Sequence, residues 1–116
     1  MQPAHIIGIT HLLIGLIVAG LSVPLILGKI PRNHTYGFRF AQSFESEHSW
    51  LVINRYGGLR LFWWSLAFSC VGGATLFLSI DPGSLLFWCL LSAPTLLLLP
   101  VVQTYRFGKH FNSESP

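Results

Sequence analysis

The sequence is 116 residues long, which is enough for one domain. Only 9% of its residues are charged and 52% are hydrophobic, whereas soluble domains carry roughly 25% charged residues. This composition excludes an ordinary soluble fold and indicates an integral membrane protein. The formal net charge of +3 is explained by a basic face beside anionic membrane lipids, so we expect no direct contact with nucleic acid.

Three apolar segments are each long enough to span a bilayer, which takes about 20 residues. They cover about residues 5–28, 59–80 and 84–105, and the only charged residue within them is Arg60. The first segment has no basic residue before it and no small-residue cleavage site after it, so we expect a retained span rather than a signal peptide. The predicted fold is all-α, a single membrane domain with three transmembrane helices. A cytoplasmic loop over residues 29–58 and a cytoplasmic tail over residues 106–116 complete it.

All basic residues fall on one side of this arrangement. The turn between the second and third spans reads DPGS and carries none, and neither does the stretch before the first span. The seven basic residues are Lys29, Arg32, Arg39, Arg55, Arg60, Arg106 and Lys109. Because short cytoplasmic loops are enriched in Lys and Arg, we expect the loop and the C-terminus inside the cell and the N-terminus outside.

Small residues recur at four-residue spacing in the first two spans, and such stripes let helices approach closely in lipid. We expect them to form the mutual contact surface: His11, Gly15 and Ala19 on the first span, and Ser65, Ser69 and Gly73 on the second. His11 is also an ionisable group inside the membrane, which makes it a functional candidate. The alternative is a neutral histidine bonded to a nearby hydroxyl, such as that of Thr75 or Ser92.

The third span contains Pro94 and Pro100, each of which removes a backbone donor and frees the carbonyl four residues earlier. We therefore expect a kinked third helix. Cys70 and Cys89 would lie at different depths in the hairpin, so we expect two free, packed thiols rather than a disulfide.

The loop divides into two halves. Proline, asparagine and glycine interrupt residues 29–40 and predict a turning segment. The second half predicts a short amphipathic helix that starts at Ser43 as its N-cap and ends or bends at Gly57–Gly58. Such a helix would lie on the cytoplasmic membrane surface, with Trp50 and Tyr56 at headgroup level.

A polar motif with fixed spacing runs through both halves of the loop. It reads N-x-x-Y-G-F-R, then a stretch with Ser and Glu, then W-x-x-x-N-R-x-x-G. This pattern resembles the signature of the SdpI family of small bacterial membrane proteins, although Phe40–Ala41 stands where that family usually has Thr-Pro. The matching positions are Asn33, Tyr36, Gly37, Arg39, Glu47, Trp50, Asn54, Arg55 and Gly58.

The resemblance implies membrane immunity or signalling in the bacterial cytoplasmic membrane. The founding member of the family protects a cell from a secreted toxic peptide and holds a transcriptional repressor at the membrane. The partners that the resemblance implies are membrane lipids, a secreted toxic peptide and a cytoplasmic repressor protein.

Two other classes of function stay open at this point. The small-residue stripes and the aromatic surface could dock an accessory subunit into a larger membrane complex. A lipid-headgroup enzyme could use Glu47, His48 and His34 for acid–base work. Since no nucleophile–base spacing and no metal-ligand spacing stand out, we expect no enzyme, no cofactor and no metal site.

The loop residues also lead to a structural hypothesis. We expect Arg39 to pair with Glu47, the turn at Gly37 to bring the first half of the loop back over the helix, and Asn54 to cap exposed backbone. Such a cluster could lock the loop in one shape. It could equally grip a partner or a lipid phosphate, which suits the geometry of arginine.

Overall fold

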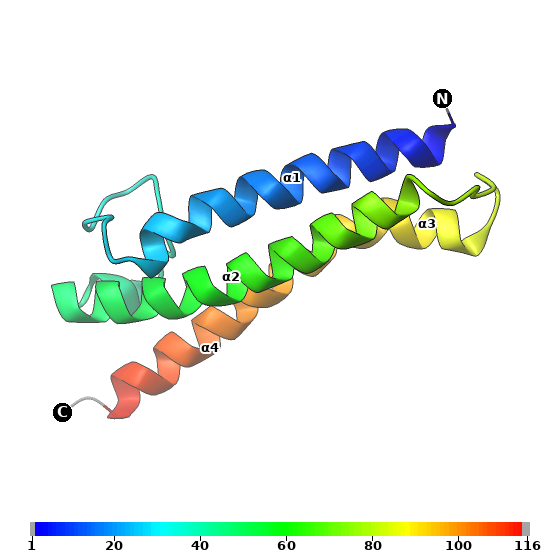
Figure 1. The fold of residues 1–116 in the computed structure, drawn as a ribbon. Helices are drawn as coiled ribbons and strands as arrows, with labels where there is room; N and C mark the ends of the chain where they lie inside the picture. The colour runs from blue at the N-terminus through cyan, green and yellow to red at the C-terminus, as the bar shows by residue number, and fades with distance from the viewer. Residues whose placement is uncertain (1, 115–116) are drawn as a thin grey trace.

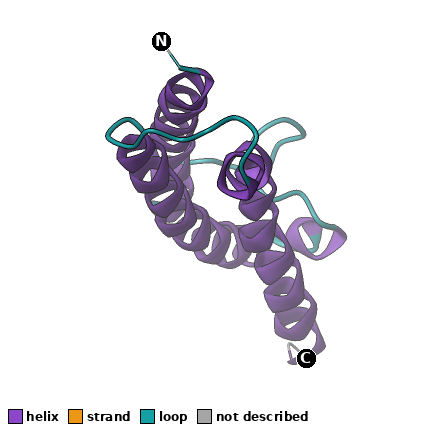
Figure 2. Cartoon of the chain, turned by 90° about the vertical axis from the view of Figure 1, so that its right-hand side faces the viewer, coloured by secondary structure: helices purple, strands orange, loops and turns teal. Residues whose placement is uncertain are grey.

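The computed structural model describes residues 2–114, with side chains up to residue 111. Within this range every residue is in a helix or a loop (Figure 2), so the predicted all-α class is confirmed. The elements in chain order are α1 (Pro3–Ile26), the 3₁₀ helix η1 (Ala41–Phe44), α2 (Glu47–Thr75), α3 (Leu85–Ser92), the 3₁₀ helix η2 (Ala93–Leu97) and α4 (Leu98–Glu114).

The molecule is a rod of 55 × 24 × 20 Å in which α2 lies in the middle and contacts both α1 and α4 (Figure 1). At one end of the rod lie the end of α1, the loop, the start of α2 and the end of α4. The start of α1 and the turn between α2 and α3 lie at the other end. The rod is longer than the hydrocarbon core of a bilayer, which is about 30 Å thick.

Small residues form the interface between α1 and α2, as predicted. The buried stripe on α1 includes Gly8, His11, Gly15, Ala19 and Ser22. On α2 the buried stripe is Ser65, Ser69 and Gly72, so the assignment of Gly73 was wrong. A Cβ added at Gly72 would lie 2.6 Å from the amide nitrogen of Leu12, whereas one at Gly73 would meet nothing closer than 3.9 Å. The spacing of four and then three residues follows the helical repeat of 3.6 better than four and four.

The predicted short amphipathic helix is not a separate element but the first part of α2, which is continuous over 29 residues. Its N-cap is Ser46 rather than Ser43, because the Ser46 hydroxyl accepts the amide hydrogen of Ser49 at 2.9 Å. Gly57 and Gly58 stay helical. A Cβ at Gly57 would lie 2.5 Å from the Phe38 ring, so close packing rather than a bend accounts for this glycine.

Within residues 2–114, two helical stretches are both long and apolar enough to cross a membrane: α1 and the run Leu85–Phe111. Only 28% and 11% of their apolar windows are buried within the chain. The core helix of a soluble protein would be mostly buried, so these faces favour lipid as their environment. The remaining long helix, α2, is less apolar because it begins with Glu47 and carries Arg55 and Arg60.

The third hydrophobic segment is interrupted at Pro94, as predicted, by the 3₁₀ helix η2 between α3 and α4. The carbonyl of Leu90, which Pro94 leaves without its helical donor, accepts a hydrogen bond from Nε2 of His11 at 2.7 Å. The predicted hydroxyl partners of His11 were wrong, since Thr75 and Ser92 bond to carbonyls of their own helices. Nδ1 of His11 is buried and has no hydrogen-bond partner among the described residues, and the ring lies 4.6 Å from that of Phe68.

The two remaining expectations for this part of the chain are met only in part. Cys70 and Cys89 are free, as predicted, but both are exposed rather than packed. The segment after residue 105, which was predicted as a tail, is helical up to Glu114 because α4 continues to that residue.

Candidate functional site

The loop folds back onto α2 through a turn at Gly37, as the sequence predicts. Gly37 has φ +114°, a conformation that favours glycine. A Cβ at this position would lie 2.7 Å from Oδ1 of Asn54 and 3.1 Å from the Trp50 ring. Glycine is therefore required both by the backbone angle and by the close approach of the loop to the helix.

The side chain of Asn54 holds the loop in this position. Its Oδ1 accepts the amide hydrogen of Phe38 at 2.6 Å, and its Nδ2 donates to the carbonyls of Phe38 at 3.4 Å and of Trp50 at 3.0 Å. Asn54 is only 2% exposed. One buried amide therefore satisfies both backbone groups of Phe38, which confirms the prediction that Asn54 caps backbone.

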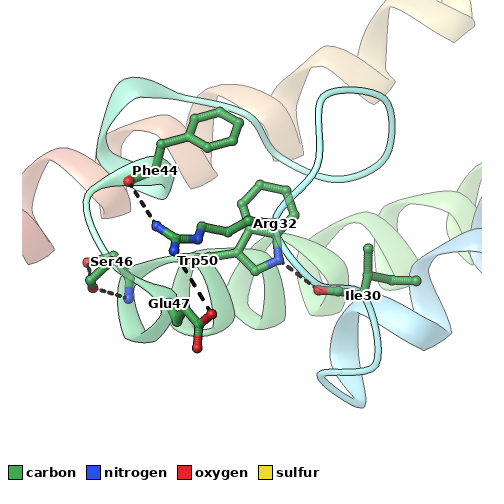
Figure 3. A network of polar contacts seen from close by, with 7 residues as sticks. Ile30, Arg32, Phe44, Ser46, Glu47 and Trp50 are labelled. Atoms are coloured by element: carbon green, nitrogen blue, oxygen red, sulfur yellow. Dashed lines mark hydrogen bonds and ion pairs between the residues drawn. The ribbon is translucent and has the colours of Figure 1, made fainter.

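Trp50 is buried under the loop and presents almost no surface to lipid, so its predicted role as an interfacial anchor was wrong. The residue is 1% exposed, and its indole nitrogen donates to the carbonyl of Ile30 at 2.7 Å (Figure 3). Its ring lies 5.5 Å from that of Phe44. A buried Trp needs an acceptor for its N–H, and the start of the loop, which covers the indole, provides one.

The first half of the loop is tied to itself and to α1. Oδ1 of Asn33 accepts the amide hydrogens of Thr35 at 2.8 Å and Tyr36 at 2.6 Å, which forms an Asx turn. The hydroxyl of Tyr36 then donates to the carbonyl of Leu21 on α1. The loop therefore runs back alongside α1.

Arg55 and Gly58 fix the end of α1 against α2. The backbone of α1 ends in a Schellman motif at Gly28, which has φ +70°. Nε of Arg55 donates to the carbonyl of Ile26 at 3.1 Å, and a Cβ at Gly58 would lie 3.0 Å from the Ile26 side chain. A cation at this position also suits the negative end of the helix dipole.

The predicted pair of Arg39 and Glu47 does not form. Glu47 lies 3.9 Å from Arg32 instead, and these side chains are 85% and 41% exposed (Figure 3). Arg39 donates to the carbonyl of His34. Because Phe38 is tied to Asn54, Arg39 is held about two helical turns, or roughly 10 Å, from the start of α2, where Glu47 lies.

The acid–base candidates are not brought together. The ring of His34 stacks on Phe44 at 5.7 Å, and the ring of His48 lies 5.9 Å from Phe111. Glu47 is directed to Arg32. These three side chains have different neighbours and do not form a catalytic constellation.

Phe38 is a part of this site that the sequence did not mark as functional. It is 8% exposed and packs with Leu25 and Ile53, while its backbone is held by Asn54. The available signal was an apolar residue directly after Gly37 in an otherwise polar stretch.

A partly open groove of about 690 Å³ lies beside the loop. Its walls come from α1, α2 and α4, and loop residues 35–40 complete the lining. Of the motif residues, Tyr36, Gly37 and Arg39 line this groove.

Comparison with known proteins agrees with the loop motif. A model of the SdpI/YfhL protein family matches residues 29–105, which include the loop and most of the three helices that follow it. No curated protein and no solved structure matches the chain.

Proposed function

The chain belongs to the SdpI/YfhL family, and from this membership we propose that it protects a bacterial cell against a secreted toxic peptide and receives a membrane signal through its 29–58 loop. The family and the two apolar helices indicate a membrane protein. The observation that carries the proposal is the fixed shape of the loop that contains the family motif.

The proposed topology has three spans, with α2 as the second. At the helical rise, 29 residues extend about 43 Å, which is longer than the hydrocarbon core of about 30 Å. The first part of α2, beside the loop, would therefore project from the membrane. The basic residues lie in elements that gather at this end of the rod, which supports a cytoplasmic loop and C-terminus and an external N-terminus.

A loop held in one shape can recognise a partner without first paying an ordering cost. Asn54 and Trp50 hold the loop from beneath, whereas Arg32, His34 and Glu47 remain exposed on its outer side. This exposed polar side is the surface that we propose for a cytoplasmic repressor. Glu47, His34 and His48 do not converge, so we propose no enzymatic activity.

The experiment that tests the proposal is a survival assay in the source bacterium. Cells that lack the gene are grown in conditioned medium from the parent strain and complemented with the wild type, Asn54→Ala or Thr10→Ala. Thr10 is the matched control because its hydroxyl bonds only to the carbonyl of Ile6 on an exposed face of α1.

We expect the deletion strain to lose viability, and the wild type and Thr10→Ala to restore it. Asn54→Ala should reach the membrane but fail to protect. If the deletion strain survives as well as its parent, the immunity proposal is wrong. Rescue by Asn54→Ala equal to the wild type would remove the fixed loop from the explanation.

The second candidate function is that of an accessory subunit in a larger membrane complex. Its support is the apolar surface of the run Leu85–Phe111, of which little is buried within this chain. Purification in a mild detergent separates the two proposals. A subunit brings a second integral membrane protein at fixed stoichiometry, whereas an immunity protein is isolated without one, even where a cytoplasmic repressor stays bound to its loop.

A further inference from the structure

We propose that the groove between α1 and α4 binds one anionic phospholipid, with its phosphate on Arg39 and an acyl chain along the helices. This inference goes beyond immunity and signalling and does not depend on a toxic peptide. It rests on the walls of the groove, on the depth of the loop and on the charge of Arg39.

The walls of the groove are apolar. Val18, Leu21 and Leu25 line it from α1, Leu61 from α2 and Val101 from α4. Both α1 and the run that contains α4 are apolar enough to cross a membrane, so the hydrocarbon of the bilayer would surround this side of the molecule. The volume of about 690 Å³ lies within the usual range for pockets that hold a small ligand, roughly 300–1,000 Å³.

The loop brings polar residues, among them Tyr36 and Arg39, to this apolar groove. The hydroxyl of Tyr36 bonds to the carbonyl of Leu21, which lies five residues before the end of α1, or about 7–8 Å along the helix. Loop residues 35–40 therefore lie beside the last turns of a membrane-crossing helix. A lipid with its chain in the groove would place its headgroup at these residues.

Arg39 selects the charge of that headgroup. It is exposed and is the only charged residue that lines the groove, and within the described part of the chain it has no carboxylate partner. The bond to the carbonyl of His34 uses one of its five N–H donors. The remaining donors can bind phosphate oxygens in the forked geometry of a guanidinium. A zwitterionic headgroup would find no carboxylate here for its ammonium group.

The test is native mass spectrometry of the full chain in a non-ionic detergent, titrated with dioctanoyl phosphatidylglycerol. Parallel titrations use dioctanoyl phosphatidylcholine and inorganic phosphate. The variants are Arg39→Gln, Arg39→Lys and Val101→Trp, which fills the groove from α4. Arg106→Gln is the control, because it removes the same charge from α4, the helix that contributes Val101, but at a position that does not line this groove.

We expect one phosphatidylglycerol per chain, with at least about tenfold weaker binding of phosphatidylcholine and of phosphate. Arg39→Gln should weaken phosphatidylglycerol about tenfold or more, since a hydrogen bond to a charged group is lost. Arg39→Lys should retain part of the affinity, Val101→Trp should abolish binding, and Arg106→Gln should leave it unchanged. The melting temperature without lipid shows that each variant is folded, and if one variant does not fold the other two still test the site.

Three results would overturn the assignment. Equal losses in Arg39→Gln and Arg106→Gln would mean that lipid binds to a diffuse basic surface. Equal affinity for phosphatidylcholine would reduce the groove to an apolar crevice without headgroup selection. Binding of phosphate as tight as that of phosphatidylglycerol would make Arg39 part of a free-anion site.

Discussion

Replacing Asn54 with alanine should release the loop from α2. The amide of Asn54 satisfies the Phe38 N–H at 2.6 Å and the Phe38 carbonyl at 3.4 Å, and alanine leaves both groups unpaired beneath the loop. A buried polar group without a partner costs about 1–3 kcal/mol. Losing the shorter bond should cost the full penalty and losing the longer one only part of it, and the small cavity left by the side chain adds to this cost. We therefore expect the free energy that holds the loop on α2 to fall by about 2–4 kcal/mol.

Amide hydrogen exchange in detergent micelles measures this release directly. Because each 1.4 kcal/mol corresponds to a factor of ten, the protection of the Phe38 amide should fall by at least about 30-fold. Thr10→Ala is again the control, since it lies on an exposed face of α1 away from the loop. Its Phe38 amide should exchange as slowly as in the wild type.

The result that would refute this reasoning is a Phe38 amide that stays protected in Asn54→Ala. The loop would then be held by the indole of Trp50 and by packing at Gly37, and the hydrogen bonds of Asn54 would contribute little. Asn54→Asp gives a second test. It keeps an acceptor for the Phe38 N–H but loses the Nδ2 donor and buries a charge, so it should also destabilise the loop.

The remaining predictions concern helix packing and topology. Gly72→Leu should lower the melting temperature in detergent far more than Gly73→Leu, because only Gly72 is in close contact with α1; equal losses would contradict the observed interface. Arg55→Ala leaves the Ile26 carbonyl without its side-chain donor and should cost about 1–2 kcal/mol in unfolding by denaturing detergent, whereas no change would mean that water replaces the guanidinium. In a background where both native cysteines are replaced, Gln2→Cys should be labelled from outside intact cells and Gln42→Cys only after permeabilisation; external labelling of Gln42→Cys would reverse the proposed topology.

Local chemistry along the chain determined much of this fold. Apolar runs predicted the helices, and the small residues around Gly15 and Ser69 predicted which faces of α1 and α2 meet. The glycine of the loop motif predicted the turn at residue 37. These features could be predicted because a helical repeat, a helix-breaking residue and a small side chain each act over a few residues.

Tertiary structure decided the partners of the polar groups and the extent of α2. Gly57 lies within a continuous helix and leaves room for the Phe38 ring, and Trp50 is buried because the loop covers it. Neither fact is visible in the local sequence, which suits a helix end and an interfacial anchor equally well.

Long-range contacts also decided which charges and donors meet. The sequence indicated that Glu47 would find an arginine, but the bond between Phe38 and Asn54 holds Arg39 away and leaves Arg32 as the partner. His11 likewise meets the carbonyl of Leu90, 79 residues further along the chain. The composition of a segment determines that such groups need partners, whereas the packing of distant helices determines which partners they obtain.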